Sequence, residues 1–88
     1  MKIIKFTALW CADCIVMRPV WKEIAEKFPM LAVVEYDFDE QKEAAEKYGV
    51  VKVPHTIFFA SDGSEIASFQ GMKNKADLLR LIEENLEK

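Results

Sequence analysis

Apolar and polar positions follow two different periods along the chain, and the changes of period mark its elements. Short apolar runs are typical of buried strands, whereas apolar residues three and four positions apart are typical of helices with one buried face. The runs that predict strands cover residues 2–9, 31–38, 53–59 and 65–69. Helical spacing covers residues 11–28, 39–48 and the segment that follows Asn74.

Prolines, glycines and capping residues define the predicted ends of the helices. Pro19 lies inside the first helical segment, where it removes a backbone N–H and predicts a kink, and a second proline ends that segment. Asp39 is a candidate N-cap of the second helix, and Gly49 follows that helix directly. Asn74, with an acidic residue three positions later, resembles a capping box at the start of the last helix.

The predicted order of elements is βαβαββα, which indicates an α/β fold. The first two strands are expected to be parallel, because a helix connects them through a right-handed crossover. The turn signal at residues 61–64 predicts an antiparallel hairpin between the last two strands. We therefore expect residues 1–88 to form one domain, with a four-stranded mixed sheet of order 2-1-3-4 and three helices on its two faces.

Composition excludes several classes of partner. The 88 residues carry a formal charge of −3 and an isoelectric point near 5.1, which argue against nucleic-acid binding. The longest apolar runs are far too short to span a bilayer. Residues 1–10 lack the apolar core and cleavage site of a signal peptide. We therefore expect a cytoplasmic monomer with neither a nucleic-acid nor a membrane partner.

The two cysteines, Cys11 and Cys14, lie at the junction between the first predicted strand and the first helix. This position puts the Cys11 sulfur at a helix N-terminus, where the helix dipole and free N–H groups favour a thiolate. Cys14 lies one turn later, close enough for a disulfide. A disulfide loop this small removes little chain entropy, so the spacing suits a reversible redox couple or a metal site better than a structural bridge.

Four motifs in order resemble the thioredoxin family over almost the whole chain. They are the active-site segment Trp10-Cys11-Ala12-Asp13-Cys14, the helix-kinking Pro19, the apolar residue and cis-proline at Val53-Pro54, and the glycine after the hairpin, Gly71. The chain is similar to a minimal version that lacks the family's first strand and helix. Together these matches are much more specific than a lone CxxC pair.

The resemblance implies a protein-disulfide reductase that works by thiol–disulfide exchange and needs no cofactor. It makes Cys11 the exposed nucleophile and Cys14 the buried resolving thiol, whose pKa is higher. Disulfide-containing proteins are the implied substrates, and a protein like thioredoxin reductase is the implied electron donor. The implied docking surface, with backbone groups beside the cis-proline pairing to an extended substrate segment, consists of Trp10, Val53, Pro54, Gly71 and Met72.

Two departures from the family surround the cysteines. Ala12-Asp13 replaces the usual Gly-Pro, so the family's redox potential does not carry over. The Asp13 carboxylate disfavours a nearby thiolate and the helix terminus favours it, and the balance stays open. His55 follows the predicted cis-proline, where threonine is common. We expect His55 to tune the local electrostatics without an essential role.

A third departure suggests a proton acceptor. Lys5 and Glu35 stand where the family usually carries a buried aspartate and its lysine partner, so the pair is charge-swapped. Lys5 interrupts an apolar strand, where an unpaired charge would be costly. Our hypothesis is that Glu35 accepts the proton of Cys14 and that Lys5 holds Glu35 in place. In the alternative, both side chains reach solvent at the sheet edge and pair weakly.

Other functions remain open from the sequence. A zinc site needs four ligands, and Cys11, Cys14 and His55 supply at most three, so a metal or iron–sulfur site would need a dimer. A glutaredoxin-like protein would use glutathione, but Trp10 and the single glycine at Gly71 favour the thioredoxin type. A pure binding module would have no need of both cysteines.

Overall fold

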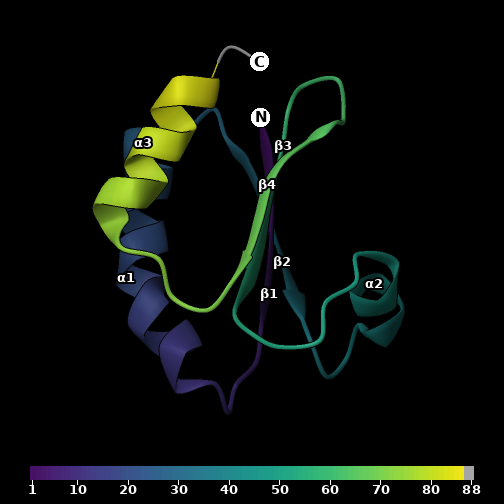
Figure 1. Cartoon of the computed structure of the whole chain (residues 1–88). Helices are drawn as coiled ribbons and strands as arrows, with labels where there is room; N and C mark the ends of the chain where they lie inside the picture. Colours follow the sequence, from purple (N-terminus) through teal and green to yellow (C-terminus); the bar gives the residue numbers. More distant parts are fainter. Residues whose placement is uncertain (87–88) are drawn as a thin grey trace.

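The computed structural model describes residues 1–86, and its elements follow the predicted order (Figure 1). The strands are β1 (Lys2–Thr7), β2 (Ala32–Asp37), β3 (His55–Phe59) and β4 (Glu65–Gln70), and the helices are α1 (Ala12–Lys27), α2 (Lys42–Lys47) and α3 (Lys75–Asn85). Most boundaries lie within two residues of the prediction. The largest difference is at α2, which begins three residues later than expected.

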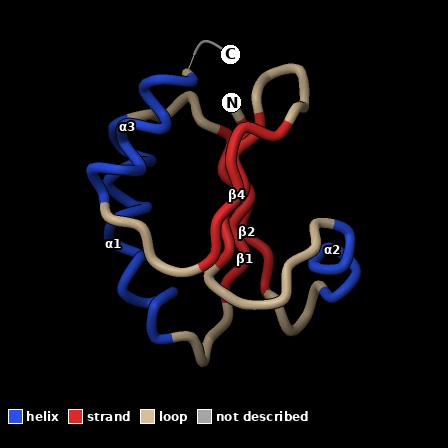
Figure 2. The backbone as a smooth tube through the Cα atoms, viewed as in Figure 1, coloured by secondary structure: helices blue, strands red, loops and turns tan. Residues whose placement is uncertain are grey.

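The four strands form one mixed sheet in the order β2-β1-β3-β4, which confirms the predicted topology. Strand β1 pairs in parallel with β2 and antiparallel with β3, and β3 pairs antiparallel with β4. Helices α1 and α3 cover one face of the sheet, and α2 lies on the other (Figures 1 and 2). Strands β2 and β4 are therefore the edges of the sheet.

Side chains of alternate residues in β1 supply two apolar cores, one on each face of the sheet. Ile3 belongs to the larger core, under α1 and α3, together with Met17, Trp21, Ile24, Phe28, Phe58, Leu78 and Ile82. Ile4 and Phe6 belong to the smaller core beside α2, which also contains Ala45 and Val50. A one-residue slip of β1 would exchange the two sets, so burial on both faces fixes its register.

Two of the predicted helix ends are confirmed. The Asn74 side chain caps α3 by accepting a hydrogen bond of 2.8 Å from the backbone N–H of Asp77. Gly49, directly after the C-cap of α2, has a φ of +68°, which favours glycine. Pro19 lies inside α1, as predicted, and the helix continues past it to Lys27. The second proline, Pro29, lies just beyond that end.

The predicted cap of α2 is wrong. The N-cap residue is Gln41, whose side chain makes no capping hydrogen bond, rather than Asp39. The reason is a local turn, in which the side chain of Asp37 accepts hydrogen bonds from the backbone N–H groups of Asp39 and Glu40, at 2.9 and 3.1 Å. This turn carries the chain away from β2 before the helix starts, and it leaves the Asp39 carboxylate free to bind elsewhere.

Three loops that carry the motifs named above meet at one end of the sheet. The β1–α1, α2–β3 and β4–α3 loops all lie at the lower end in Figure 1. They bring together Cys11, Pro54 and Gly71, which are far apart in the sequence.

Within residues 1–86, the helices are too short or too polar to cross a membrane.

Candidate redox site

Cys11 is the N-cap residue of α1, as the sequence predicted. Its backbone is extended, with φ −87° and ψ 109°, and its sulfur accepts a hydrogen bond of 3.2 Å from the backbone N–H of Cys14. A sulfur in this position receives both the partial positive charge of the helix terminus and a direct N–H donor. Both interactions direct positive partial charge at the Cys11 sulfur.

Both cysteines are buried free thiols, which corrects the expectation that Cys11 is exposed. The exposed fraction is 6% for Cys11 and 3% for Cys14. The two sulfurs form a small apolar cluster with Ala8, and Val53 of the α2–β3 loop packs against it. The exposed sulfur was an expectation from the family resemblance, and in this chain Val53 of the α2–β3 loop packs against the cysteines. A substrate disulfide must therefore approach closely to reach the Cys11 sulfur.

Cys14 is a buried thiol with a raised pKa. Burial, followed by its hydrogen bond with Cys11, raises the pKa of Cys14 from 9.0 to about 11, and the charge of Asp13 adds to this direction. Cys14 is therefore protonated near neutral pH and is a poor first nucleophile. This matches the higher pKa expected for a resolving thiol.

Trp10 is an exposed side chain whose orientation is fixed by a hydrogen bond. Its Nε1–H donates to the carboxylate of Asp39, at 2.6 Å. This bond links the β1–α1 loop to the β2–α2 loop. Sequence reasoning missed Asp39 as a site residue and treated it as a helix cap. The parallel pairing of β1 and β2 was the available signal, because it places the loops after both strands at the same edge.

The α2–β3 and β4–α3 loops are joined beside the cysteines. The Val53–Pro54 peptide bond is cis, as the resemblance implied, and Pro54 is buried. The Pro54 carbonyl accepts a hydrogen bond of 2.7 Å from the Gly71 N–H. Gly71 has a φ of +82°, and a Cβ built on it would meet nothing within 4 Å. The positive φ of Gly71 is a backbone conformation that favours glycine.

Lys5 and Glu35 form the expected pair across neighbouring strands. They are register partners in β1 and β2, and Lys5 Nζ lies 3.4 Å from a Glu35 carboxylate oxygen. The Lys5 side chain is 13% exposed and also lies 5.2 Å from the ring centroid of Trp21, while the Glu35 side chain is 54% exposed. Lys5 is thus held under α1, as the hypothesis of a buried pair expects. Glu35 reaches solvent at the sheet edge, as the alternative of a solvent-exposed pair expects.

His55 is buried on the sheet face opposite α1. It shares this face with Ile57 and Phe59, which alternate with it along β3. Its Nε2 lies 2.7 Å from the Ser68 hydroxyl, and its Nδ1 has no hydrogen-bond partner within residues 1–86. Burial lowers the pKa of His55, and the charge of Glu65 opposes this shift weakly. His55 is therefore a neutral group near physiological pH, and α1 with its cysteines lies across the sheet.

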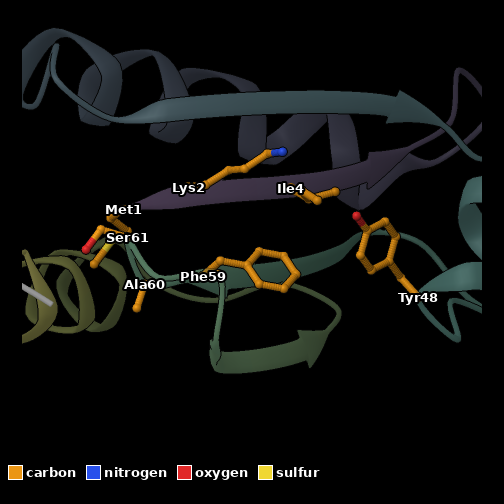
Figure 3. A pocket seen from close by; sticks show the side chains of 8 residues that line it. Met1, Lys2, Ile4, Tyr48, Phe59, Ala60 and Ser61 are labelled. Atoms are coloured by element: carbon orange, nitrogen blue, oxygen red, sulfur yellow. The ribbon is translucent and has the colours of Figure 1, made fainter.

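Among the residues that the structure describes, neither a metal-ligand cluster nor the hollow beside β1 and β3 forms part of the cysteine site. Within residues 1–86, no group of three or more His, Cys, Asp or Glu side chains is arranged to hold a metal ion. A hollow of about 360 Å³ lies where β1 and β3 meet the loops around Tyr48 and Gly63, and its lining includes Lys2, Ile4 and Phe59 (Figure 3). It contains neither cysteine nor Pro54, so it is separate from the site described above.

The βαβαββα order, the cysteine pair at the N-terminus of α1 and the cis-proline beside it define a dithiol protein of the thioredoxin fold. Comparison with known proteins agrees, because the family model described as Thioredoxin matches residues 1–84. The chain belongs to the thioredoxin family.

Individual relatives show how much of the family's length is present. The chain is 45% identical to a thioredoxin H-type of Oryza sativa subsp. indica over 80 residues, which are 91% of this chain and 64% of that protein. It is 35% identical to the thioredoxin of Bacillus subtilis over 82 residues, 92% of this chain and 78% of that one. A mutant thioredoxin from Halobacterium salinarum superposes with a TM-score of 0.89 at 34% identity, over 99% of this chain and 75% of that one.

Proposed function

We propose that residues 1–88 act as one thioredoxin-like domain that reduces disulfides in protein substrates. The observation that carries the proposal is the arrangement of the two cysteines. The Cys11 sulfur lies at the N-cap of α1 and accepts a hydrogen bond from the Cys14 N–H, and the protonated Cys14 thiol lies one turn later. This geometry gives the two cysteines different chemistry. Cys11 is the attacking thiolate, and Cys14 is the resolving thiol.

The exchange proceeds in two balanced steps. The Cys11 thiolate attacks one sulfur of the substrate disulfide, the substrate S–S bond breaks, and the departing substrate sulfur takes the electron pair and a proton. Cys14 then loses its proton and attacks Cys11, which releases the second substrate sulfur as a thiol and leaves a Cys11–Cys14 disulfide. The substrate gains two electrons, and the domain is oxidised. A donor similar to thioredoxin reductase restores the dithiol.

The second step needs a proton acceptor, because the pKa of Cys14 is about 11. We assign this role to Glu35, acting through water, with Lys5 positioning the carboxylate at 3.4 Å. Glu35→Gln keeps the shape of the side chain and removes its basicity, so it should slow the resolution of a mixed disulfide and change its pH profile. Glu83→Gln is a matched control, because Glu83 also pairs with a lysine, at 3.8 Å, and is 57% exposed. Equal resolution kinetics for the two variants across pH would refute the assignment.

Substrates dock on Trp10, Val53 and Met72, around the buried Pro54 and the Gly71 turn. Trp10 and Met72 are exposed, and Val53 packs directly against the cysteines. The Pro54 carbonyl is already bonded to Gly71 and proline has no N–H. The backbone groups left to pair with an extended substrate segment are therefore those of Val53. Ala12 and Asp13 set the redox potential from between the cysteines.

The proposed setting is the reducing cytoplasm, where the domain acts as a monomer. One cysteine pair at an exchange site suits a compartment that keeps thiols reduced. His55 is assigned only an indirect influence on the site, because it lies on the other face of the sheet as a neutral side chain.

Trapping of the mixed disulfide tests the proposal. The Cys14→Ser variant can attack a substrate but cannot resolve the intermediate, so incubation with insulin should give a covalent adduct at Cys11 that dithiothreitol releases. Cys11→Ser is the control and should give none. Mass spectrometry of the adduct locates the bond. The proposal fails if Cys14→Ser forms no adduct, or if both variants form equal amounts.

A further inference from the structure

Exposed apolar side chains gather at the end of the molecule that carries the cysteines. The large apolar residues that are exposed within residues 1–86 are Leu9, Trp10, Ile15, Val16, Met30, Val33, Val51 and Met72. Most of them lie in, or next to, the loops that surround Cys11. Exposed apolar side chains gathered around one site often mark a binding surface, because a folded monomer gains nothing from leaving them in water.

Three of these residues lie beside Cys11 and outside the docking surface described above. Leu9, Ile15 and Val16 are 80%, 50% and 56% exposed, and we call them the apolar shoulder. Leu9 precedes Trp10 in the β1–α1 loop, and Ile15 and Val16 follow Cys14 in the first turns of α1. The shoulder is therefore built from both segments that flank the active-site dipeptide.

The helix geometry places Ile15 of the shoulder one turn from Cys11. The Ile15 N–H donates to the Cys11 carbonyl at 3.3 Å, so Ile15 stands one helical turn above Cys11. Cys14 and Met17 are the buried residues of this part of α1. Ile15 and Val16 consequently lie on the outward side of the same turns, where they contribute nothing to the core.

A substrate has to cover this surface. Cys11 is 6% exposed, so its sulfur is reached only by a segment that lies closely over the site. The residues on either side of the attacked substrate cysteine then lie against the side chains on either side of Cys11. Trp10 and Leu9 lie just before Cys11 in the chain, and Ile15 lies one helical turn after it, so exposed apolar side chains stand on both sides of the sulfur along the chain.

We propose that the apolar shoulder selects substrates whose reactive disulfide is flanked by apolar side chains such as leucine or phenylalanine. This inference rests on the proposed exchange reaction at Cys11 and names its substrate class. The reaction itself is unchanged, with one S–S bond broken and one formed at Cys11. The shoulder lowers the KM for apolar flanks, because their burial removes apolar surface from water on both sides.

Two synthetic peptide disulfides test the inference. They are identical except that the residues beside each cysteine are leucine in one and serine in the other, which changes no charge. The rate of reduction by the reduced domain is measured for both, and each rate is divided by the rate at which iodoacetamide alkylates Cys11. This normalisation removes any change in the thiol itself. For each protein, the normalised rate with the leucine peptide divided by the normalised rate with the serine peptide gives its preference for apolar flanks.

The variant Ile15→Ser/Val16→Ser removes most of the shoulder, and Met30→Ser is its matched control. Met30 is 65% exposed and lies beyond Lys27, the last residue of α1, which is about 24 Å from Cys11 along the helix axis. Covering roughly 60 Å² of apolar surface corresponds to about a tenfold gain in binding. We therefore expect the wild type and Met30→Ser to prefer leucine about tenfold and the double variant to lose most of that preference.

Each outcome bears on a different claim. Equal rates for the two peptides in the wild type, or the same preference in the double variant, would overturn the inference while leaving the exchange reaction intact. A concentration-dependent dimer of the wild type that the double variant abolishes would also overturn it, because a second copy would then cover the shoulder. Failure of the wild type to reduce either peptide through Cys11 would instead refute the proposed function and, with it, the inference.

Discussion

The raised pKa of Cys14 makes a quantitative prediction about its reactivity. A pKa of about 11, compared with 9.0 for an unperturbed thiol, lowers the thiolate fraction about a hundredfold at pH 8 and below. At pH 8, roughly one Cys14 in a thousand is ionised in the folded protein and about one in ten in the unfolded chain. Burial and the hydrogen bond with Cys11 cause the difference, so unfolding should abolish it.

The assay is pulsed alkylation of the reduced protein with iodoacetamide between pH 7 and 12. Short pulses that modify only a small fraction of the molecules keep the two thiols independent, and mass spectrometry of the intact chain and its peptides separates modification at Cys11 from modification at Cys14. We predict that the alkylation rate of Cys14 rises with a midpoint near pH 11 in the folded protein and near pH 9 in urea. A midpoint near pH 9 in both states would refute the argument from burial.

The same pKa shift determines how stability depends on alkaline pH. Because the pKa of Cys14 is raised in the folded state, its stabilising effect is complete below pH 9 and is lost as the pH rises toward 11. Urea unfolding of the reduced protein should therefore give a falling free energy of unfolding over this range. Cys14→Ser, which does not titrate there, is the control and should show a weaker dependence.

The remaining predictions concern the core, the buried histidine and the active-site tryptophan. Phe58→Ala should lower the free energy of unfolding by about 3–5 kcal/mol, measured in urea, because Phe58 is fully buried against Trp21. Because the pKa of His55 is lowered in the folded state, its contribution to the free energy of unfolding is complete above pH 6.5 and is lost as the pH falls. The free energy of unfolding should therefore drop between pH 7 and 5 in the wild type and stay level in His55→Gln. Asp39→Ala should raise the KM for insulin about fivefold and change the fluorescence of Trp10, through loss of a hydrogen bond of about 1 kcal/mol; an unchanged KM would contradict this role.

The fold was predictable from the sequence because local signals and long-range packing agree. Apolar runs in β1 are buried on both faces of the sheet, and Asn74 caps α3 through its own side chain. These features depend on residues that are neighbours in sequence or on one strand. The start of α2 was mispredicted because Asp37, rather than Asp39, organises the preceding turn, and the two aspartates are equivalent in a propensity argument.

The identities of the candidate site residues were predictable, whereas their environments were not. Cys11 was correctly placed at a helix N-terminus, but its burial depends on Val53, which reaches it from a distant loop. The partner of Trp10 is Asp39, and that contact exists only because β1 and β2 end side by side. The predicted strand order indicates which loops lie at the same edge of the sheet, but the pattern of apolar and polar residues does not say which side chains of those loops meet.

In the proposed reaction Cys11 and Cys14 form a catalytic dithiol couple, and reduction of insulin by dithiothreitol tests this couple most directly. Precipitation of the reduced insulin chains is followed by turbidity with the wild type, with Cys11→Ser and with no protein. We predict that the wild type accelerates precipitation and that Cys11→Ser gives the rate without protein. A folded wild type that gives no acceleration, or a Cys11→Ser variant as active as the wild type, would contradict the claim.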